Sequence, residues 1–274
     1  MTSSRKKSNV VLSVILWLCS LFVLIPVYMV VINSFKSRTE AAEMDISLPS
    51  KLHILGNYAQ MIEEGGVLRG LLVSTIVTVI SVSALVLLGS TMAYVFERKR
   101  TRLAGSLNTL MIIGLVLPIQ IIPTYFICQA MHLPHMVAAI LVLIVVNIPF
   151  TVFLYTGYMK SIPREIDEAA WIDGAGSLQT FFRIIFPLLK PMTITAIIIN
   201  FMAVWNDFSV SIYFLNSADT YTLPLTVYNF FGNHGSDWQL VFANVVFASL
   251  PVAILYLALQ KQIIAGMTGG AVKG

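Results

Sequence analysis

No aspartate, glutamate, lysine or arginine occurs between Arg102 and Lys160. A helix needs about 20 apolar residues to cross the roughly 30 Å hydrocarbon layer of a bilayer, because every backbone amide must be satisfied within the segment. The run is too long for one crossing and suits two. Its polar interruption is His132-Leu133-Pro134-His135, where proline ends a helix. The run therefore predicts two transmembrane helices joined by a turn.

Four further apolar segments are long enough to cross a bilayer, and they lie at residues 7–36, 70–96, 192–215 and 240–259. The composition agrees, with 57% hydrophobic residues, 11% charged residues and a mean hydropathy of +0.84. Such values lie outside the range of soluble proteins. The sequence predicts an all-α membrane protein with six transmembrane helices.

The positive charges are distributed unequally between the two sides that this topology defines. The chain has 17 lysines and arginines. Four of them, Lys36, Arg38, Lys51 and Arg69, lie on one side of the membrane, and the remaining 13 lie on the opposite side. Cytoplasmic loops carry the excess of such residues, so both termini are expected in the cytoplasm. The positive net charge of the chain is then explained by its orientation in the membrane, and it does not indicate nucleic-acid binding.

The topology divides the chain into three parts. Residues 1–69 are expected to form an N-terminal tail, the first transmembrane helix and a partly folded external loop. Residues 70–262 form a core of five helices with a long cytoplasmic loop at 160–190, and residues 263–274 form a cytoplasmic tail.

The cytoplasmic loop contains the acidic segment IDEAAWIDGAG, from Ile166 to Gly176. Pro163 suits the first turn of a helix, and the acids at 165, 167 and 168 complement its positive end. Gly174 and Gly176 supply a stop. We expect a helix of about ten residues, roughly 15 Å long at 1.5 Å per residue.

A second short helix is expected to begin near Ser177, with the serine hydroxyl as its cap. Four apolar residues of this helix are expected to face the membrane: Phe181, Phe182, Ile184 and Ile185. Pro187 and Pro191 should then bend the chain into the next transmembrane helix.

A helix of ten residues is unstable alone in water and must pack against something. Its small residues allow close approach to a partner and its acids allow charge pairing. The alternative is a capped loop helix without a partner, and composition alone does not choose between them.

The spacing in this loop resembles the signature of binding-protein-dependent ABC importer permeases, in which Glu-Ala-Ala and a glycine precede Ile-x-Leu-Pro. The matching residues are Glu168, Ala169, Ala170, Gly174, Ile184 and Pro187, and Phe186 replaces the usual leucine. Other segments resemble the carbohydrate-import subfamily with its MalG-type inner-membrane subunit: Pro118, Gln120 and Pro123, the runs 148–150, 173–175 and 205–207, and the tail 266–274.

The resemblance implies a type I importer (MetI-like) fold and a permease subunit that imports a sugar or oligosaccharide across a bacterial inner or plasma membrane. It implies a second, homologous permease chain in a heterodimer, two cytoplasmic ATPase subunits and an extracellular or periplasmic solute-binding protein. In that family the loop helix docks on the ATPase. By position, the contact would involve Glu165, Glu168, Ala169, Ala170, Asp173 and Gly174.

No segment matches the glycine-rich phosphate-binding loop with its Gly-Lys-Ser/Thr ending. The chain is therefore expected to be non-catalytic and to bind no cofactor, with ATP and Mg²⁺ on the partner ATPase. His132 and His135 are separated by Pro134, which disrupts a shared helical face, so no metal site is expected.

Asp207 is the acid that lies well inside a predicted span, where a lipid-facing carboxylate would be costly. With Trp205 and Asn206 it could line a sugar path, or it could hydrogen-bond neighbouring helices. Gln120, between Pro118 and Pro123, could mark a gate or a simple kink. The residues leave both pairs of alternatives open.

Three alternatives to a sugar importer remain. The permease could carry another small solute, the chain could be an ion-coupled secondary transporter, or it could be a membrane scaffold. A secondary transporter would be expected to contain more intramembrane ionisable residues than Asp207.

Overall fold

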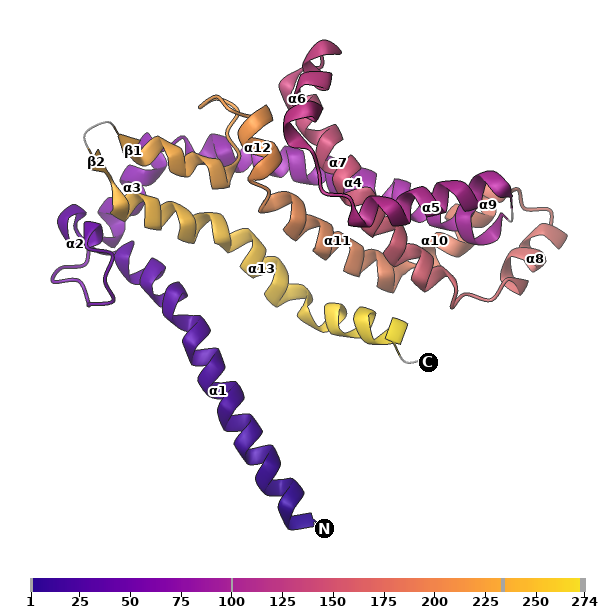
Figure 1. Cartoon of the computed structure of the whole chain (residues 1–274), viewed down its shortest axis with the longest axis horizontal. Coiled ribbons are helices and arrows are strands. Elements are labelled where there is room, and N and C mark those ends of the chain that lie inside the picture. Colours follow the sequence, from indigo (N-terminus) through magenta and orange to yellow (C-terminus); the bar gives the residue numbers. More distant parts are fainter. Residues whose placement is uncertain (1, 100, 233–234, 272–274) are drawn as a thin grey trace. The chain divides into compact units, whose positions relative to one another are not determined.

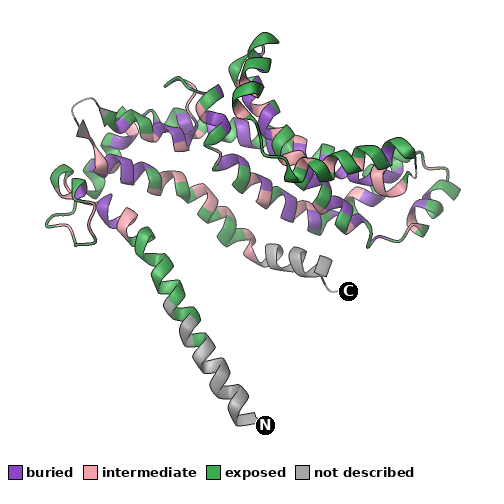
Figure 2. Ribbon diagram, in the orientation of Figure 1, coloured by how far each residue is buried: buried purple, intermediate pink, exposed green. Residues whose placement is uncertain are grey.

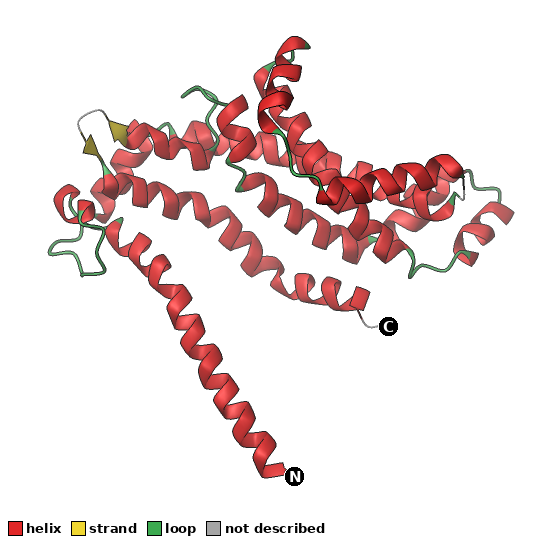
Figure 3. Cartoon of the chain, in the orientation of Figure 1, coloured by secondary structure: helices red, strands yellow, loops and turns green. Residues whose placement is uncertain are grey.

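The computed structural model describes residues 2–99, 101–232 and 235–271. The regular structure of the described chain is almost entirely helical, as Figure 3 shows, and this confirms the all-α part of the prediction. Two-residue strands β1 (Phe231–Gly232) and β2 (Gly235–Ser236) pair antiparallel. Asn233 and His234 of the predicted loop lie outside the described residues.

The helices follow one another as labelled in Figure 1. Their bounds are α1 (Thr2–Asn33), α2 (Arg38–Ala42), α3 (Ile54–Glu64), α4 (Val67–Arg98), α5 (Arg102–Val116), α6 (Ile121–Ala130), α7 (His135–Met159), α8 (Glu165–Ile172), α9 (Ser177–Thr180), the π-helix η1 (Phe181–Ile185), α10 (Phe186–Leu188), α11 (Lys190–Trp205), α12 (Ser209–Phe214), the 3₁₀-helix η2 (Leu223–Phe230) and α13 (Trp238–Ala271).

Three described helical segments are long and apolar enough to cross a membrane: Val67–Arg98, His135–Met159 and Trp238–Gln260. A fourth span is possible if Ser177–Leu188 and Lys190–Trp205, which meet at 78°, count as one broken crossing. Shorter apolar helices lie at Cys19–Asn33, Arg102–Val116 and Ile121–Ala130. The number six and the orientation of the termini stay predictions.

Two of the predicted spans are not single helices, contrary to the sequence-based expectation. The third breaks between α5 and α6, where Leu117 is extended (φ −76°, ψ 124°) because it precedes Pro118. The fifth breaks between α11 and α12, at residues 206–208. Gln120 and Asp207, which were placed within spans, therefore lie at helix breaks.

The chain forms two compact units, and the division falls inside α4, η2 and α13. The first unit joins residues 1–68 to residues 226–249. Within it, the predicted external loop contains α2 and α3, and Asn57 donates to the backbone oxygens of Ser34 and Lys36 at 2.9 Å. Asn229 donates to the Gly65 carbonyl, also at 2.9 Å.

The second unit joins residues 69–225 to residues 250–274 and contains two apolar clusters. Polar pairs link α7 to α11 inside this core: Thr151 donates to Asn200 Oδ1 at 3.0 Å, and the Tyr155 and Thr193 hydroxyls lie 3.1 Å apart. Such pairs hold transmembrane helices together. Gly89 lets α4 approach α7, because a Cβ there would lie 2.6 Å from Thr151 Cγ2.

Large apolar side chains remain exposed along the helices (Figure 2). Trp17 and Phe22 on α1 are 72% and 75% exposed, and Phe126 on α6 is 63% exposed. Exposed apolar surface on this scale marks contact with lipid or with partner subunits.

Candidate functional site

The predicted loop helix exists as α8, which has eight residues and stands between two loops (Figures 1 and 3). It is shorter than the expected ten residues and about 12 Å long at 1.5 Å per residue. Arg164 precedes it without a side-chain cap. Glu165, Asp167 and Glu168 occupy the first turn, where acids interact favourably with the helix dipole.

The C-terminus of α8 ends in a Schellman motif. The Gly174 amide donates to Trp171 O at 3.0 Å, and the Ala175 amide donates to Ala170 O at 2.9 Å. Gly174 has φ +81°, which L side chains rarely adopt, whereas a Cβ at this position would meet nothing within 4 Å. Glycine is therefore required here for conformation and not for space.

The next helical segment differs from the prediction in two respects. Gly176, not Ser177, is the N-cap of α9, and no side chain caps it. Of the residues expected to face the membrane, Phe181 and Ile185 are instead buried, at 2% and 0% exposed, because they pack in the core with Tyr155 and Leu189. The bend before α11 is present as predicted.

One side of α8 is exposed, and we call it the outer face. Of the predicted contact residues, it includes Glu165, Glu168, Ala169, Asp173 and Gly174. Trp171 and Ile172 add apolar surface, at 52% and 87% exposed, and Leu178 after the turn is 75% exposed. An apolar patch rimmed by acids is typical of a protein-docking surface.

The opposite side of α8 is buried, and we call it the inner face. Ala170 is 4% exposed and Asp167 is 2% exposed. Ala170 was predicted as a docking contact. Its side chain instead packs inside this chain and helps to hold α8 in place. Asp167 was considered only for its interaction with the helix dipole.

Asp167 forms a buried ion pair with the last residue of α4. Its Oδ2 lies 2.9 Å from Nε of Arg98, and the two side chains are 3% and 6% exposed. Arg98 Nη2 also donates to the Ile162 carbonyl at 3.0 Å. The sequence offered little signal for this pair, because its members lie in segments that only the fold brings together.

A second arginine, Arg164 just before α8, contacts the end of α4. Arg164 Nη2 donates to the Glu97 carbonyl at 2.7 Å and lies 3.5 Å from Glu97 Oε1. Each arginine thus binds a backbone carbonyl and a carboxylate of the other segment. We call these four residues, Glu97, Arg98, Arg164 and Asp167, the α4–α8 clamp.

The predicted translocation residues lie around the break between α11 and α12. Trp205 is 4% exposed and stacks on Phe201, with ring centroids 5.3 Å apart. Asn206 is exposed, and its amide group donates to Met202 O at 3.0 Å. Asp207 is half-buried and accepts from the backbone amides of Val210 and Ser211, both at 3.0 Å.

Asp207 therefore caps the first turn of α12. One of the two expectations for Asp207 was a hydrogen bond to a neighbouring transmembrane helix, and these contacts do not include one. Gln120 is exposed at the start of α6, where its backbone carbonyl accepts from the Thr124 hydroxyl at 2.8 Å. The contacts of Gln120 and of Asp207 are thus local to their own helix breaks.

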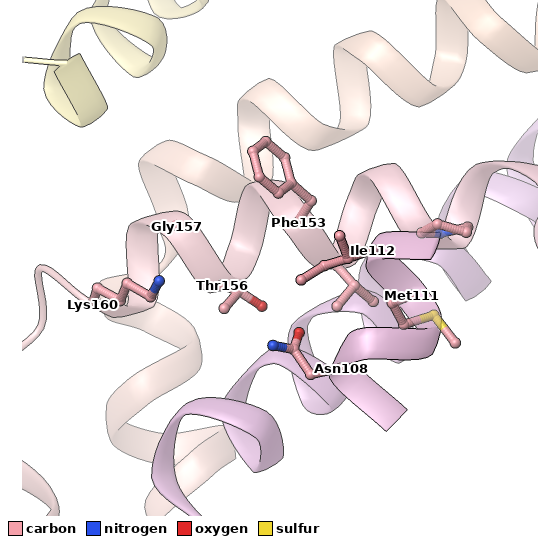
Figure 4. Close-up of a pocket in the computed structure, with 9 residues that line it drawn as sticks. Asn108, Met111, Ile112, Phe153, Thr156, Gly157 and Lys160 are labelled. Atoms are coloured by element: carbon pink, nitrogen blue, oxygen red, sulfur yellow. The ribbon is translucent and has the colours of Figure 1, made fainter. Parts of the chain in front are cut away.

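Two cavities lie in the second unit. One, about 440 Å³ in volume, is lined by α4 and α11 and includes Thr78, Ser83 and Phe201, the stacking partner of Trp205. The other, about 120 Å³, lies between α5 and α7, where Asn108 and Thr156 face each other (Figure 4). The smaller cavity is below the size of typical ligand pockets. The wall of the larger one is mostly apolar, because its other lining residues are Val79, Val82, Val86, Leu87 and Ile197.

Comparisons with known proteins identify the family of the chain. The family model for the binding-protein-dependent transport system inner membrane component matches residues 85–269. The chain is 34% identical over 278 residues to the melibiose/raffinose/stachyose import permease protein MelC of Bacillus subtilis, with 100% of each chain covered. It is 37% identical over 268 residues to the multiple sugar-binding transport system permease protein MsmG of Streptococcus mutans, with 95% of each covered.

A solved structure has a similar fold. It is a bacterial ABC transporter involved in the import of the acidic polysaccharide alginate, and the match has a TM-score of 0.81 at 20% identity. It covers 95% of this chain and 98% of the other. At this identity the likeness establishes the fold alone.

Proposed function

The chain belongs to the family of binding-protein-dependent transport system inner membrane components, and from this premise we propose that it imports a sugar or oligosaccharide as the permease subunit of an ATP-driven transporter. The names of the relatives MelC and MsmG support a sugar as the solute. The outer face of α8 is the observation that supports ATP-driven coupling most directly.

In this proposal the outer face of α8 docks on a cytoplasmic ATPase. Ile172 and Trp171 supply the apolar centre of the contact, and Glu165, Glu168 and Asp173 form a charged rim. Interfaces with an apolar centre and a polar rim are the common arrangement. Closure of the ATPase pair on ATP would then move α8 and switch the helix bundle between inward-facing and outward-facing states.

The remaining subunits follow from the same proposal. Two ATPase subunits bind ATP and Mg²⁺, so this chain needs no cofactor and remains non-catalytic. A second, homologous permease chain completes the pathway, and a solute-binding protein delivers the sugar outside the membrane. We place six spans in the bacterial plasma or inner membrane, with both termini in the cytoplasm, on the charge distribution.

The path of the sugar is proposed to pass the break between α11 and α12. Asn206 is exposed there, and Phe201 lines the cavity of about 440 Å³ next to the stacked Trp205. Aromatic faces and amide groups are suited to binding sugar rings and hydroxyls. Gln120 at the other break is a second candidate for the path.

The first test is to tag the chain at its native locus, purify it from detergent-solubilised membranes and identify co-purifying proteins by mass spectrometry. We expect an ATPase and a second permease chain, both reduced by Glu168→Lys with Ile172→Ser. Glu63→Lys, an exposed charge reversal on α3, is the matched control and should leave recovery unchanged.

The second test reconstitutes the purified complex in liposomes and measures ATP-dependent uptake of radiolabelled raffinose and melibiose. Uptake of either sugar would support the proposal. A complex that takes up neither sugar, but does import another solute with ATP, would favour the alternative substrate class. Recovery of the chain without any ATPase, with uptake driven by an ion gradient, would favour a secondary transporter.

A further inference from the structure

We propose that the α4–α8 clamp joins α8 to the end of α4 so that the two move together when the ATPase closes. Arg98 and Asp167 are then positioning residues for energy coupling. The inference rests on the proposed function of the outer face. It adds the element that receives the motion, namely α4, and the side chains that transmit it.

Short loops join α8 to its neighbours: residues 160–164 lie between α7 and α8, and residues 173–176 lie between α8 and α9 (Figure 3). The first loop is tied to α7, because the Ile162 amide donates to the Met159 carbonyl at 3.1 Å and the Ile162 side chain is buried in the core. The clamp adds a direct connection from α8 to α4, which is not its neighbour in sequence.

The geometry of the clamp resists sliding and rotation. Arg98 reaches from α4 to the Ile162 carbonyl at 3.0 Å and to Asp167 at 2.9 Å. Arg164 reaches back to the Glu97 carbonyl at 2.7 Å. Because the two arginines cross in opposite directions and each binds two groups, a shift that relaxes one contact strains another. Arg98 acts in two ways: Nη2 donates a hydrogen bond to the Ile162 carbonyl, whereas Nε and the Asp167 carboxylate attract each other as charges without a hydrogen bond.

The electrostatics also favour the joined arrangement. Carbonyls at the C-terminus of α4 lack helical partners, and the Arg164 guanidinium satisfies the Glu97 carbonyl there. Asp167 lies in the first turn of α8, where the helix dipole favours a carboxylate. With Asp167 and Arg98 3% and 6% exposed, separation would leave two buried charges unpaired.

The apolar surroundings extend the joined body into the core. Tyr94, one turn before Arg98, is 7% exposed and lies 5.2 Å from the Phe181 ring, centroid to centroid. Tyr94 is also close enough to Asp167 and Arg98 to interact with both charges. The clamp therefore sits at the edge of a packed cluster and not in a solvated loop.

The inference predicts that the clamp and the outer face can be separated by mutation. Asp167→Asn and Arg98→Gln change the inner face and leave Ile172 and Glu168 exposed for docking. The ATPase should still bind, but its closure should no longer move α4.

The experiment uses the complete complex, purified through the tagged chain, in a background with Cys19 and Cys128 replaced by alanine. A spin label on Val95→Cys reports on α4, where the native side chain is 36% exposed. The signal is the fraction of label that changes mobility on adding ATP with vanadate. Co-purified ATPase is quantified in the same samples.

We expect both single variants to retain the ATPase and to lower the shifted fraction about tenfold, within the usual range for coupling between sites. Arg98→Lys keeps the charge but not the planar donors and should give an intermediate value. The exchanged pair Arg98→Asp/Asp167→Arg should recover part of the shift. Lys99→Gln, which removes an adjacent exposed charge, should match the unmodified complex.

The outcomes are distinguishable. A full shift in Asp167→Asn would overturn the inference while the proposed function stands. Loss of the ATPase from that variant, with no recovery in the exchanged pair, would also overturn it, because the pair would then only shape the docking surface. An unmodified complex that contains no ATPase would overturn the proposed function, and the inference with it.

Discussion

The segment around α2 and the segment around α8 are both short helices in polar loops, but they are stabilised differently. In α2, Ser37 and Glu40 form a capping box, in which the Ser37 amide donates to Glu40 Oε2 at 3.1 Å and the Glu40 amide donates to Ser37 Oγ at 3.4 Å. Glu40 also accepts from Ser50, and Lys36 pairs with Asp45. The distant ion pair of Arg38 with Asp237 is largely exposed, at 62% and 32%.

In α8 the corresponding contacts are distant in sequence and buried. No side chain caps its N-terminus. Asp167 in its first turn pairs with Arg98 of α4, and Arg164 just before it donates to the Glu97 carbonyl. The polar contacts of α2 are therefore mostly local in sequence, although Ala41 is buried and Asn57 donates to the Lys36 carbonyl, whereas the main ion pair of α8 is made with α4. A helix that depends on a distant element is also one that can move that element.

The largest expected difference is in local stability. Asp167→Asn removes the carboxylate that pairs with Arg98 but leaves the Arg98–Ile162 and Arg164–Glu97 hydrogen bonds, so it should loosen the packing of α8 by about 1–3 kcal/mol without unfolding it. Asp45→Asn should destabilise the α2 segment less, because Asp45 is 43% exposed. In this variant Lys36 Nζ can still donate to the backbone carbonyl of residue 45 and to Ser47 Oγ, both at 3.3 Å. Hydrogen exchange of peptides covering 164–175 and 38–47 measures both effects.

If the two mutations reduced hydrogen-exchange protection of their peptides equally, the claim that α8 depends more on its ion pair than α2 does would be wrong. Glu43→Gln, an exposed acid beside α2, serves as a control that should change neither peptide.

A second difference concerns whether an exposed apolar residue takes part in ATPase binding. Ile172 on α8 and Leu55 on α3 are both 87% exposed. Ile172→Ser should weaken ATPase binding about tenfold, the effect of losing a central apolar contact of roughly 1.4 kcal/mol. Leu55→Ser should leave ATPase binding unchanged. Titration of purified ATPase against each variant in detergent compares them, and equal affinities would remove the special role of the outer face.

A third, smaller effect tests the turn that ends α8. Gly174→Ala forces a side chain onto φ +81° and should destabilise the turn by about 1–2 kcal/mol. Gly176→Ala is the matched control, because φ is −73° there and its Cβ would meet nothing within 4 Å. Thermal unfolding in micelles and ATPase recovery should both decline for the first variant only. An equal decline in both would mean that the loss of flexibility, not the positive φ, is responsible.

The sequence predicted the features of this molecule that depend on local chemistry. The helical class, α8 with its glycine stop, and the bend near Pro187 all follow from residue types and spacing within a few turns. The breaks at residues 117–120 and 206–208 were underestimated, because proline and a buried acid do not distinguish a kinked helix from a broken one. In the structure, the extended Leu117 and the capping carboxylate of Asp207 decide this.

The inner face of α8 could not be predicted for a different reason. The acids of IDEAAWIDGAG look alike in sequence, and only the packing of α4 against the loop separates the buried Asp167 from the exposed Glu165 and Glu168. Likewise Ala170 has the same residue type as Ala169 but faces the interior. Contacts over 60 residues apart depend on the whole bundle and leave little trace in local composition.

The smallest expected effect is the pH response of the α2 segment. Hydrogen bonds from Ser50 and Ser37 lower the pKa of Glu40 from 4.5 to about 2. A lowered pKa in the folded state contributes stability that is full above the unfolded value of 4.5 and is lost as the pH falls from there towards 2. Exchange from the peptide covering 38–47, corrected for intrinsic rates, should therefore accelerate between about pH 5 and about pH 3. Hydrogen bonds from Lys36 and Ser47 also lower the pKa of Asp45, which lies in the same peptide. Glu40→Gln should therefore reduce this acceleration, and the double variant Glu40→Gln/Asp45→Asn should abolish it. An unchanged profile in the double variant would mean that α2 draws its stability from more distant contacts, as α8 does, and the contrast between the two segments would then fail.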